Sequence, residues 1–183
     1  MLYTTFDLLR ETRACNDGYR KLAKYLGGVK KYGAQTPVPL AEILKSNGID
    51  DTLWVLRCCT DSEKARRLSQ IIACDYAEHV LHFWEEKFPG DKRPRAAIET
   101  SRRYIKGTAT AEEVDAAGAA ASAARAAAGA AVWVAASAAV WAAASAARDA
   151  AARAAAWAAA GDAAWDAESA WQKTRFSKLL EAN

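Results

Sequence analysis

The feature that most constrains the fold is a long alanine-rich tract in the C-terminal half of the chain. Of the 52 residues from Ala116 to Ala167, 33 are alanine, and no proline follows Pro94. Alanine loses no side-chain rotamer freedom in a helix, so the tract must be helical. One helix of about 60 residues would be roughly 90 Å long, whereas a compact chain of this length has a radius of gyration of about 16 Å. We therefore expect the tract to fold back on itself, with breaks at Gly129 and Gly161 and a weaker candidate at Gly118.

Tryptophans supply the bulk that alanine lacks. They recur in one four-residue column of the tract, at Trp133, Trp141, Trp157 and Trp165. A four-residue repeat drifts by about 40° each time around a 3.6-residue helix, so each pair of tryptophans can serve one packing face. Alanine surfaces let helix backbones approach closely, and the indoles fill the space between them. We predict an all-α multi-helix bundle with Ala-rich C-terminal helical hairpins and with these four tryptophans in its core.

A membrane span is the alternative interpretation of the tract. The 22 residues from Ala126 to Ala147 carry no charge, which satisfies the length rule for a bilayer. They contain no Leu, Ile or Phe, and the mean hydropathy of the chain is −0.18. The sequence therefore favours a protein that does not enter a membrane.

Helix patterns also dominate the chain before the tract. Residues 1–60 predict short helices around a loop at residues 29–39, and the stretch 61–183 predicts an Ala-rich bundle that we expect to be one compact unit. The strongest amphipathic helix begins at a capping box from Thr60 to Glu63 and ends at Phe88-Pro89-Gly90. A second capping box, from Thr110 to Glu113, precedes the alanine tract. No segment has the alternation of a strand.

Cysteine usage indicates the compartment. The four cysteines have no disulfide-framework spacing, and the N-terminal residues lack the apolar core of a signal peptide. We expect a protein of the reducing cytoplasm.

The densest cluster of reactive side chains is Cys74, Asp75, Glu78, His79 and His82. On a helix Asp75 and His79 lie four apart, as do Glu78 and His82, so each pair can meet on the surface. A zinc site needs three or four converging ligands, and one helix offers at most two on a face. A nucleophilic Cys74 would need a histidine base beside it, but His79 points well round the helix. We expect structural roles here, and neither a catalytic residue nor a metal or cofactor.

Two basic segments are candidates for binding a partner: Lys30-Lys31 beside Tyr32, and Lys92-Arg93-Pro94-Arg95. Other cations and one aromatic residue could extend such a patch, namely Arg66, Arg67, Arg102, Arg103 and Tyr104. The net charge is only +3, and a surplus of 19 Lys and Arg over 14 Asp and Glu in residues 1–110 is modest. An acidic protein or a nucleic acid would suit the patch, and an ordinarily solvated surface is the alternative.

Residues 74–99, CDYAEHVLHFWEEKFPGDKRPRAAIE, are followed by an alanine-tryptophan tract and then by AWQKTRFSKLLE. This combination, over roughly residues 65 to 181, resembles the immunity-protein family of bacterial polymorphic toxin systems. The stretch PVPLAEILKSNGIDDTLWVLR, within residues 1–60, is similar to the leading part of bacteriophage proteins that carry the same tail.

The resemblance implies an all-helical cytoplasmic protein that neutralises a partner protein by binding and occlusion. We expect a non-enzymatic stoichiometric inhibitor, monomeric or homodimeric, that confers immunity to a toxin. The alternative is a phage-encoded inhibitor of a host defence complex, such as an anti-CRISPR; an enzyme or a membrane-inserted protein is a further, weaker alternative. Partner binding is predicted at Lys30, Lys31, Tyr32, Lys92, Arg93 and Arg95.

Overall fold

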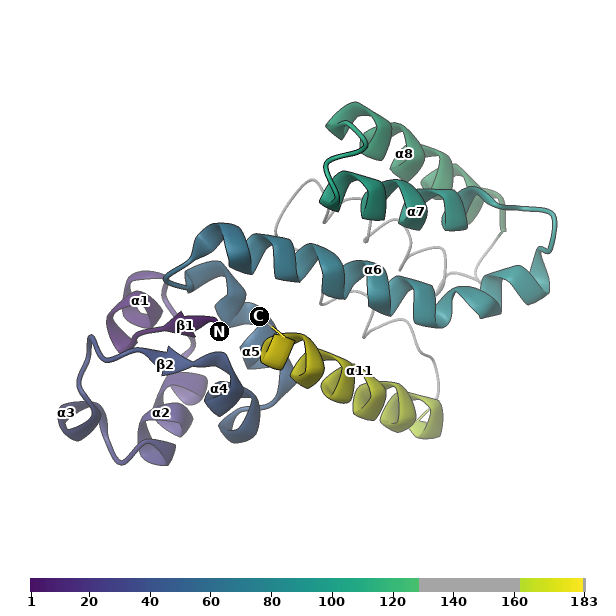
Figure 1. The fold of residues 1–183 in the computed structure, drawn as a ribbon. Coiled ribbons are helices and arrows are strands. Elements are labelled where there is room, and N and C mark those ends of the chain that lie inside the picture. Colours follow the sequence, from purple (N-terminus) through teal and green to yellow (C-terminus); the bar gives the residue numbers. More distant parts are fainter. Residues whose placement is uncertain (129–161, 183) are drawn as a thin grey trace. The chain divides into compact units, whose positions relative to one another are not determined.

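The computed structural model describes residues 1–128 and 162–182 of the chain (Figure 1). This part is predominantly helical and contains one pair of two-residue strands, which confirms the expected all-α class. It divides into two compact units, Met1–Arg66 with Lys173–Asn183, and Arg67–Gln172. The division between residues 60 and 61 suggested by the sequence stays a prediction.

The first unit opens on a strand pair that the sequence does not predict. Strand β1 (Tyr3–Thr4) pairs antiparallel with β2 (Val38–Pro39), with Thr4 opposite Val38. The buried Thr4 hydroxyl donates to the carbonyl of Cys58 at 2.6 Å. The pair joins segments far apart in sequence, and two residues are too few for an alternating pattern.

Helix α1 (Phe6–Glu11) begins at Thr5, whose hydroxyl accepts from the backbone N–H of Leu8 at 3.1 Å. The first unit continues through α2 (Asn16–Tyr25), α3 (Val29–Tyr32), α4 (Leu40–Ser46), α5 (Ile49–Val55) and the 3-10 helix η1 (Leu56–Cys58). Its buried apolar side chains include Phe6, Leu9, Leu22, Val38, Leu40, Ile43 and Leu44.

Helix α6 (Ser62–Lys87) begins one residue later than its predicted capping box requires. The carboxylate of Asp61 accepts from the backbone N–H of Lys64 at 2.9 Å, so Asp61 is the cap. Thr60 has another role, because its backbone N–H and its hydroxyl both donate to the carbonyl of Tyr3, at 2.9 and 3.3 Å.

In the second unit, α7 (Arg93–Ile105) and α8 (Ala111–Ala128) lie side by side in an antiparallel pair next to α6 (Figure 1). One buried cluster joins the three helices, formed by Cys74, Ala77, Val80, Leu81, Trp84, Ile98 and Ala124. Alanine lets α8 approach closely, as predicted for the start of the tract, and α8 continues through Gly118 without a break.

Helix α11 (Asp162–Ala182) provides the last described segment. Its residue Gln172 accepts a hydrogen bond at its backbone carbonyl from the buried Tyr76 hydroxyl of α6, at 3.1 Å. The expected breaks at Gly129 and Gly161 and the predicted hairpins lie outside the described residues, as do the side chains of the four column tryptophans.

Candidate functional site

The α6–α7 connection is the best-defined candidate surface. Helix α6 ends before the Phe88-Pro89-Gly90 turn, and the indole N–H of Trp84 donates to the carbonyl of Asp91 at 3.2 Å. A carboxylate oxygen of Asp91 accepts from the backbone N–H of Arg93 at 3.1 Å. Pro94 fits the first turn of α7, where its missing N–H costs nothing. Asp91 is thus held at its carbonyl by α6 and at its carboxylate by α7.

Two of the predicted cations at this connection are held in ion pairs. The guanidinium of Arg93 donates twice to the Asp91 carboxylate, at 2.8 and 2.6 Å. Arg95 donates twice to Glu85, at 2.5 and 2.6 Å. These hydrogen bonds lower the pKa of Asp91 and of Glu85, because they stabilise the charged carboxylates. Both arginines are therefore fixed in orientation before any partner arrives.

Lys92 lies between these pairs and is exposed. A shallow, open depression surrounds it, lined by Gly90, Asp91, Lys92, Arg93 and Ala96. Small-molecule sites usually enclose most of their ligand, which an open depression does not do. This depression is better suited to a protruding group of a partner protein.

The other three predicted residues belong to α3 in the first unit. Lys30 and Lys31 are exposed. Tyr32 is half-buried: its ring packs edge-on against Phe6 with centroids 6.1 Å apart, and its hydroxyl donates to the carbonyl of Pro37 at 3.0 Å. The contacts of Tyr32 give it a role in holding the loop after α3.

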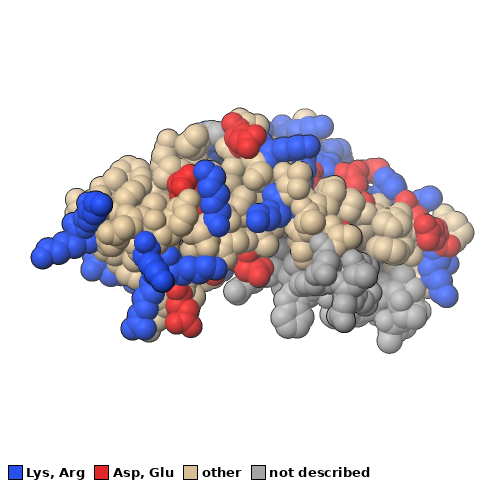
Figure 2. Space-filling view, turned by 90° about the horizontal axis from the view of Figure 1, so that it is seen from below, with Lys and Arg blue, Asp and Glu red and all other residues tan. Residues whose placement is uncertain are grey.

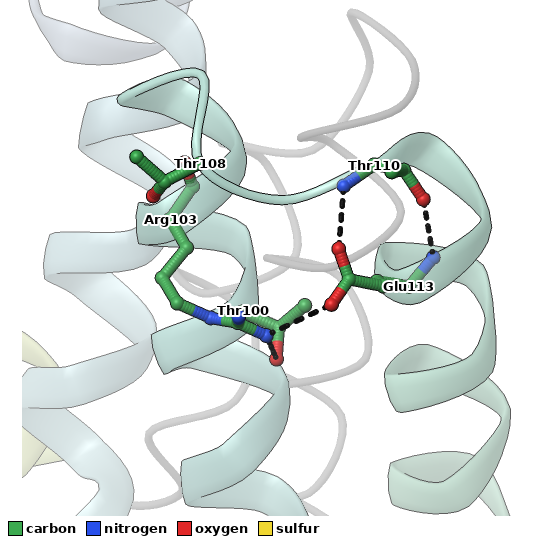
Figure 3. A network of polar contacts seen from close by, with 5 residues as sticks. All are labelled: Thr100, Arg103, Thr108, Thr110 and Glu113. Carbon is green, nitrogen blue, oxygen red and sulfur yellow. Dashed lines mark hydrogen bonds and ion pairs between the residues drawn. The ribbon is translucent and has the colours of Figure 1, made fainter.

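Three of the other basic residues considered from the sequence, Arg66, Arg102 and Arg103, form ion pairs. Arg102 donates to the buried Asp75 at 2.9 Å and also pairs with Glu78. Arg103 reaches from α7 toward α8, and its guanidinium lies 3.4 Å from the Glu113 carboxylate (Figure 3). Glu113 and Thr110 form the predicted capping box, with bonds of 2.7 and 3.2 Å, so this prediction is confirmed. Arg102 and Arg103 thereby tie α7 to its neighbouring helices.

The reactive cluster of α6 has structural partners. The His79 ring stacks on Trp171 of α11, with centroids 3.6 Å apart, and its Nε2 lies 3.0 Å from the buried Glu168 carboxylate. Glu168 also accepts from the amide of Gln172 at 2.9 Å. The contact of His79 with Glu168, from another helix, could not be read from spacing along α6.

The cysteines in the core are poorly suited to nucleophilic chemistry. Cys74 is fully buried, and burial raises the pKa of its thiol to about 12. Burial likewise raises the pKa of Cys59 to about 12. Both thiols stay protonated at neutral pH, and only the thiolate is a good nucleophile. Among the described residues, no three His, Cys, Asp or Glu side chains converge as a metal site requires.

Phe83 is a candidate contact residue that the sequence analysis misses. Its side chain is 48% exposed near the end of α6, and the ring of His82 lies 4.0 Å from it, centroid to centroid. The sequence does contain a sign of this exposure: Phe83 lies outside the apolar stripe that includes Val80 and Trp84 at helical spacing. An exposed aromatic ring is a common anchor of protein interfaces.

Comparison with known proteins identifies a family for the part of the chain that contains the second unit. Residues 61–178, well over half of the chain, match the family described as "Imm-5 like putative immunity protein". The chain therefore belongs to this immunity-protein family, as its resemblance implied. The matched region contains α6, α7, α8 and most of α11.

Neither of the other two comparisons adds a relative: no curated protein and no solved structure matches the chain. In the described ranges, 1–128 and 162–182, every helix is too short or too polar to cross a bilayer.

Proposed function

We propose that this chain is a stoichiometric immunity protein, which neutralises a protein toxin by binding it and covering a functional surface. The observation that carries the proposal is the family match over residues 61–178. The proposal places the chain in the cytoplasm, where its free cysteines would stay reduced.

The exposed groups at the end of α6 and the start of α7 support a contact site inside the matched region. Phe83 offers an apolar anchor, and Lys92 adds an exposed positive charge. Arg93 and Arg95 are oriented by their carboxylate partners, which lowers the entropy that each would lose on binding. We propose that Lys92, Arg93 and Arg95 contact the toxin and define them as the connection surface. Phe83 lies two residues before Glu85, on another side of α6, and we propose it as a separate contact.

Binding alone can account for neutralisation of the toxin, with no reaction catalysed by the chain. The buried thiols are protonated, and His79 is held between Trp171 and Glu168. Occlusion requires only a complementary surface, which a rigid helical unit presents at little conformational cost.

The test begins with capture of partners by the tagged chain from bacterial lysate after nuclease treatment. A captured protein is then expressed alone and together with this chain. The proposal expects a protein that arrests growth alone and is tolerated when this chain is present. Capture of a subunit of a defence complex, with no effect on any toxin, would instead support the anti-defence alternative.

Charge reversal tests the connection surface. We expect the double variant K92E/R93E to bind the captured toxin at least tenfold more weakly, because charge reversal at a contact introduces repulsion. The matched control is K106E, at an exposed lysine at the opposite end of α7, which should bind normally. Unchanged binding by the double variant would remove this site from the proposal.

A further inference from the structure

A separate basic surface lies outside the family-matched region, on α2 and α3. The chain carries five cations and no Asp or Glu between Gly18 and Ala41. We define the α2–α3 surface as these cations with one tyrosine: Arg20, Lys21, Lys24, Tyr25, Lys30 and Lys31. The compact unit that contains them has 14 Lys and Arg against 9 Asp and Glu, so it carries a moderate positive charge.

Helix geometry gathers the α2 cations on one face. Leu22 is the buried residue of α2 and points toward the core. At 100° per residue, Arg20, Lys21 and Lys24 fall within about 100° of one another on the side away from Leu22. All three are exposed. The single acidic residue of α2, Asp17, lies in its first turn.

Two glycines bring α3 against the end of α2. Gly27 and Gly28 have φ angles of 80° and 99°, in the region that residues with a Cβ rarely adopt. The turn that they allow places the Lys31 side chain next to Gly27, where its Cδ would lie 3.8 Å from an added Cβ. Lys30 and Lys31 therefore extend the positive charge of α2 past its C-terminal end.

Tyr25 places an exposed aromatic ring among these cations. Its side chain is 49% exposed, and its hydroxyl donates to the Glu42 carboxylate at 3.0 Å. Lys45 pairs with the same carboxylate at 2.7 Å, which offsets the negative charge of Glu42. The ring is thus held in place by its hydroxyl end. Figure 2 shows several blue side chains at its left, the side on which Figure 1 shows α1, α2 and α3.

We infer that the α2–α3 surface binds nucleic acid through its phosphate backbone. Four of its five cations are lysines, and lysine is depleted in protein–protein interfaces, where apolar and aromatic groups form the centre. Phosphate contacts need only mobile positive charges, which exposed lysines supply without sequence selectivity. The ring of Tyr25 can stack on an unpaired base. This activity is independent of toxin neutralisation, which we assign to the connection surface.

The test measures fluorescence anisotropy of a labelled DNA duplex and of a labelled RNA strand, each of about 20 nucleotides per strand, titrated with the full chain. At about 50 mM salt we expect binding, and log K for the duplex should fall with log salt with a slope of about −4 to −5 if five cations contact phosphates. The variant K21Q/K24Q/K31Q should bind at least tenfold more weakly and reduce the slope to about −2.

The matched control is K87Q/K106Q/K178Q, which removes the same charge at three exposed lysines elsewhere. Circular dichroism verifies that both triple variants fold.

Equal loss of binding in the control would contradict the assigned surface. Absence of binding at low salt would contradict nucleic-acid binding, and so would tighter binding to a polyglutamate peptide of equal charge, which would assign the surface to an acidic protein. If K21Q/K24Q/K31Q loses nucleic-acid binding but still inhibits the toxin, the two activities use different surfaces.

Discussion

At the scale of single residues, two adjacent aromatic side chains of α6 have opposite surroundings. Trp84 is 1% exposed in the cluster that joins α6, α7 and α8, whereas Phe83 is 48% exposed. Their helix positions differ by one residue, or about 100°, which is enough to separate core from solvent. The two residues therefore allow stability and binding to be tested separately.

We expect Trp84→Ala to lower the free energy of unfolding by about 3–5 kcal/mol, since it leaves a cavity and removes the hydrogen bond to Asp91. Phe83→Ala should lower it by only about 1 kcal/mol, because the side chain is already 48% exposed in the native protein. Urea unfolding followed by circular dichroism measures both. Under our proposal Phe83→Ala also weakens toxin binding. A folded variant that binds as well as the wild type would remove Phe83 from the contact site.

Thiol reactivity is a second test at this scale. Cys15 is exposed, whereas Cys58, Cys59 and Cys74 are buried, and burial raises the pKa of all three buried thiols. Because a raised pKa keeps a thiol protonated at pH 8, we expect a chromogenic disulfide reagent to modify one thiol per native chain and all four after unfolding. Rapid modification of several thiols in the native protein would contradict the described core.

At the scale of the elements, a capping motif predicts a helix start correctly when its residues bond to each other and not to a distant segment. The pattern from Thr110 to Glu113 predicts the start of α8, and the structure forms both of its hydrogen bonds. The equivalent pattern at Thr60 is wrong: Asp61 caps α6 instead, and the backbone N–H of Thr60, which the box needs for Glu63, donates to the carbonyl of Tyr3, 57 residues away. A contact between distant segments cannot be inferred from a four-residue motif.

The capping box gives a prediction for α8. Thr110→Ala removes the acceptor for the backbone N–H of Glu113 and should destabilise the protein by about 1 kcal/mol. Thr110→Ser keeps the acceptor and should be close to neutral, which makes it the matched control. Comparison of the two urea midpoints checks the cap. Equal midpoints for the alanine and serine variants would show that the cap does not contribute.

At the scale of the whole molecule, the helical class follows from alanine content and amphipathic spacing, whereas tertiary polar contacts do not. The stack of His79 on Trp171 and the pairing of Arg95 with Glu85 join different helices. The basic segments could be located from the sequence. That Arg93 and Arg95 are ion-paired while Lys92 and Lys31 are exposed depends on packing that the sequence does not display.

The family match is the basis on which we propose a binding role for the chain, and stoichiometry distinguishes binding from catalysis. A binder inactivates its partner in proportion to the amount added, whereas an enzyme that modifies the toxin inactivates many copies per chain.

The most direct measurement is a titration of the purified toxin's activity with this chain, at a toxin concentration far above the dissociation constant of the complex. We predict a linear loss of activity that ends at a fixed small-integer ratio of chain to toxin and does not progress with time. Complete, time-dependent inactivation by a small fraction of an equivalent would contradict the account and show that the chain acts as an enzyme.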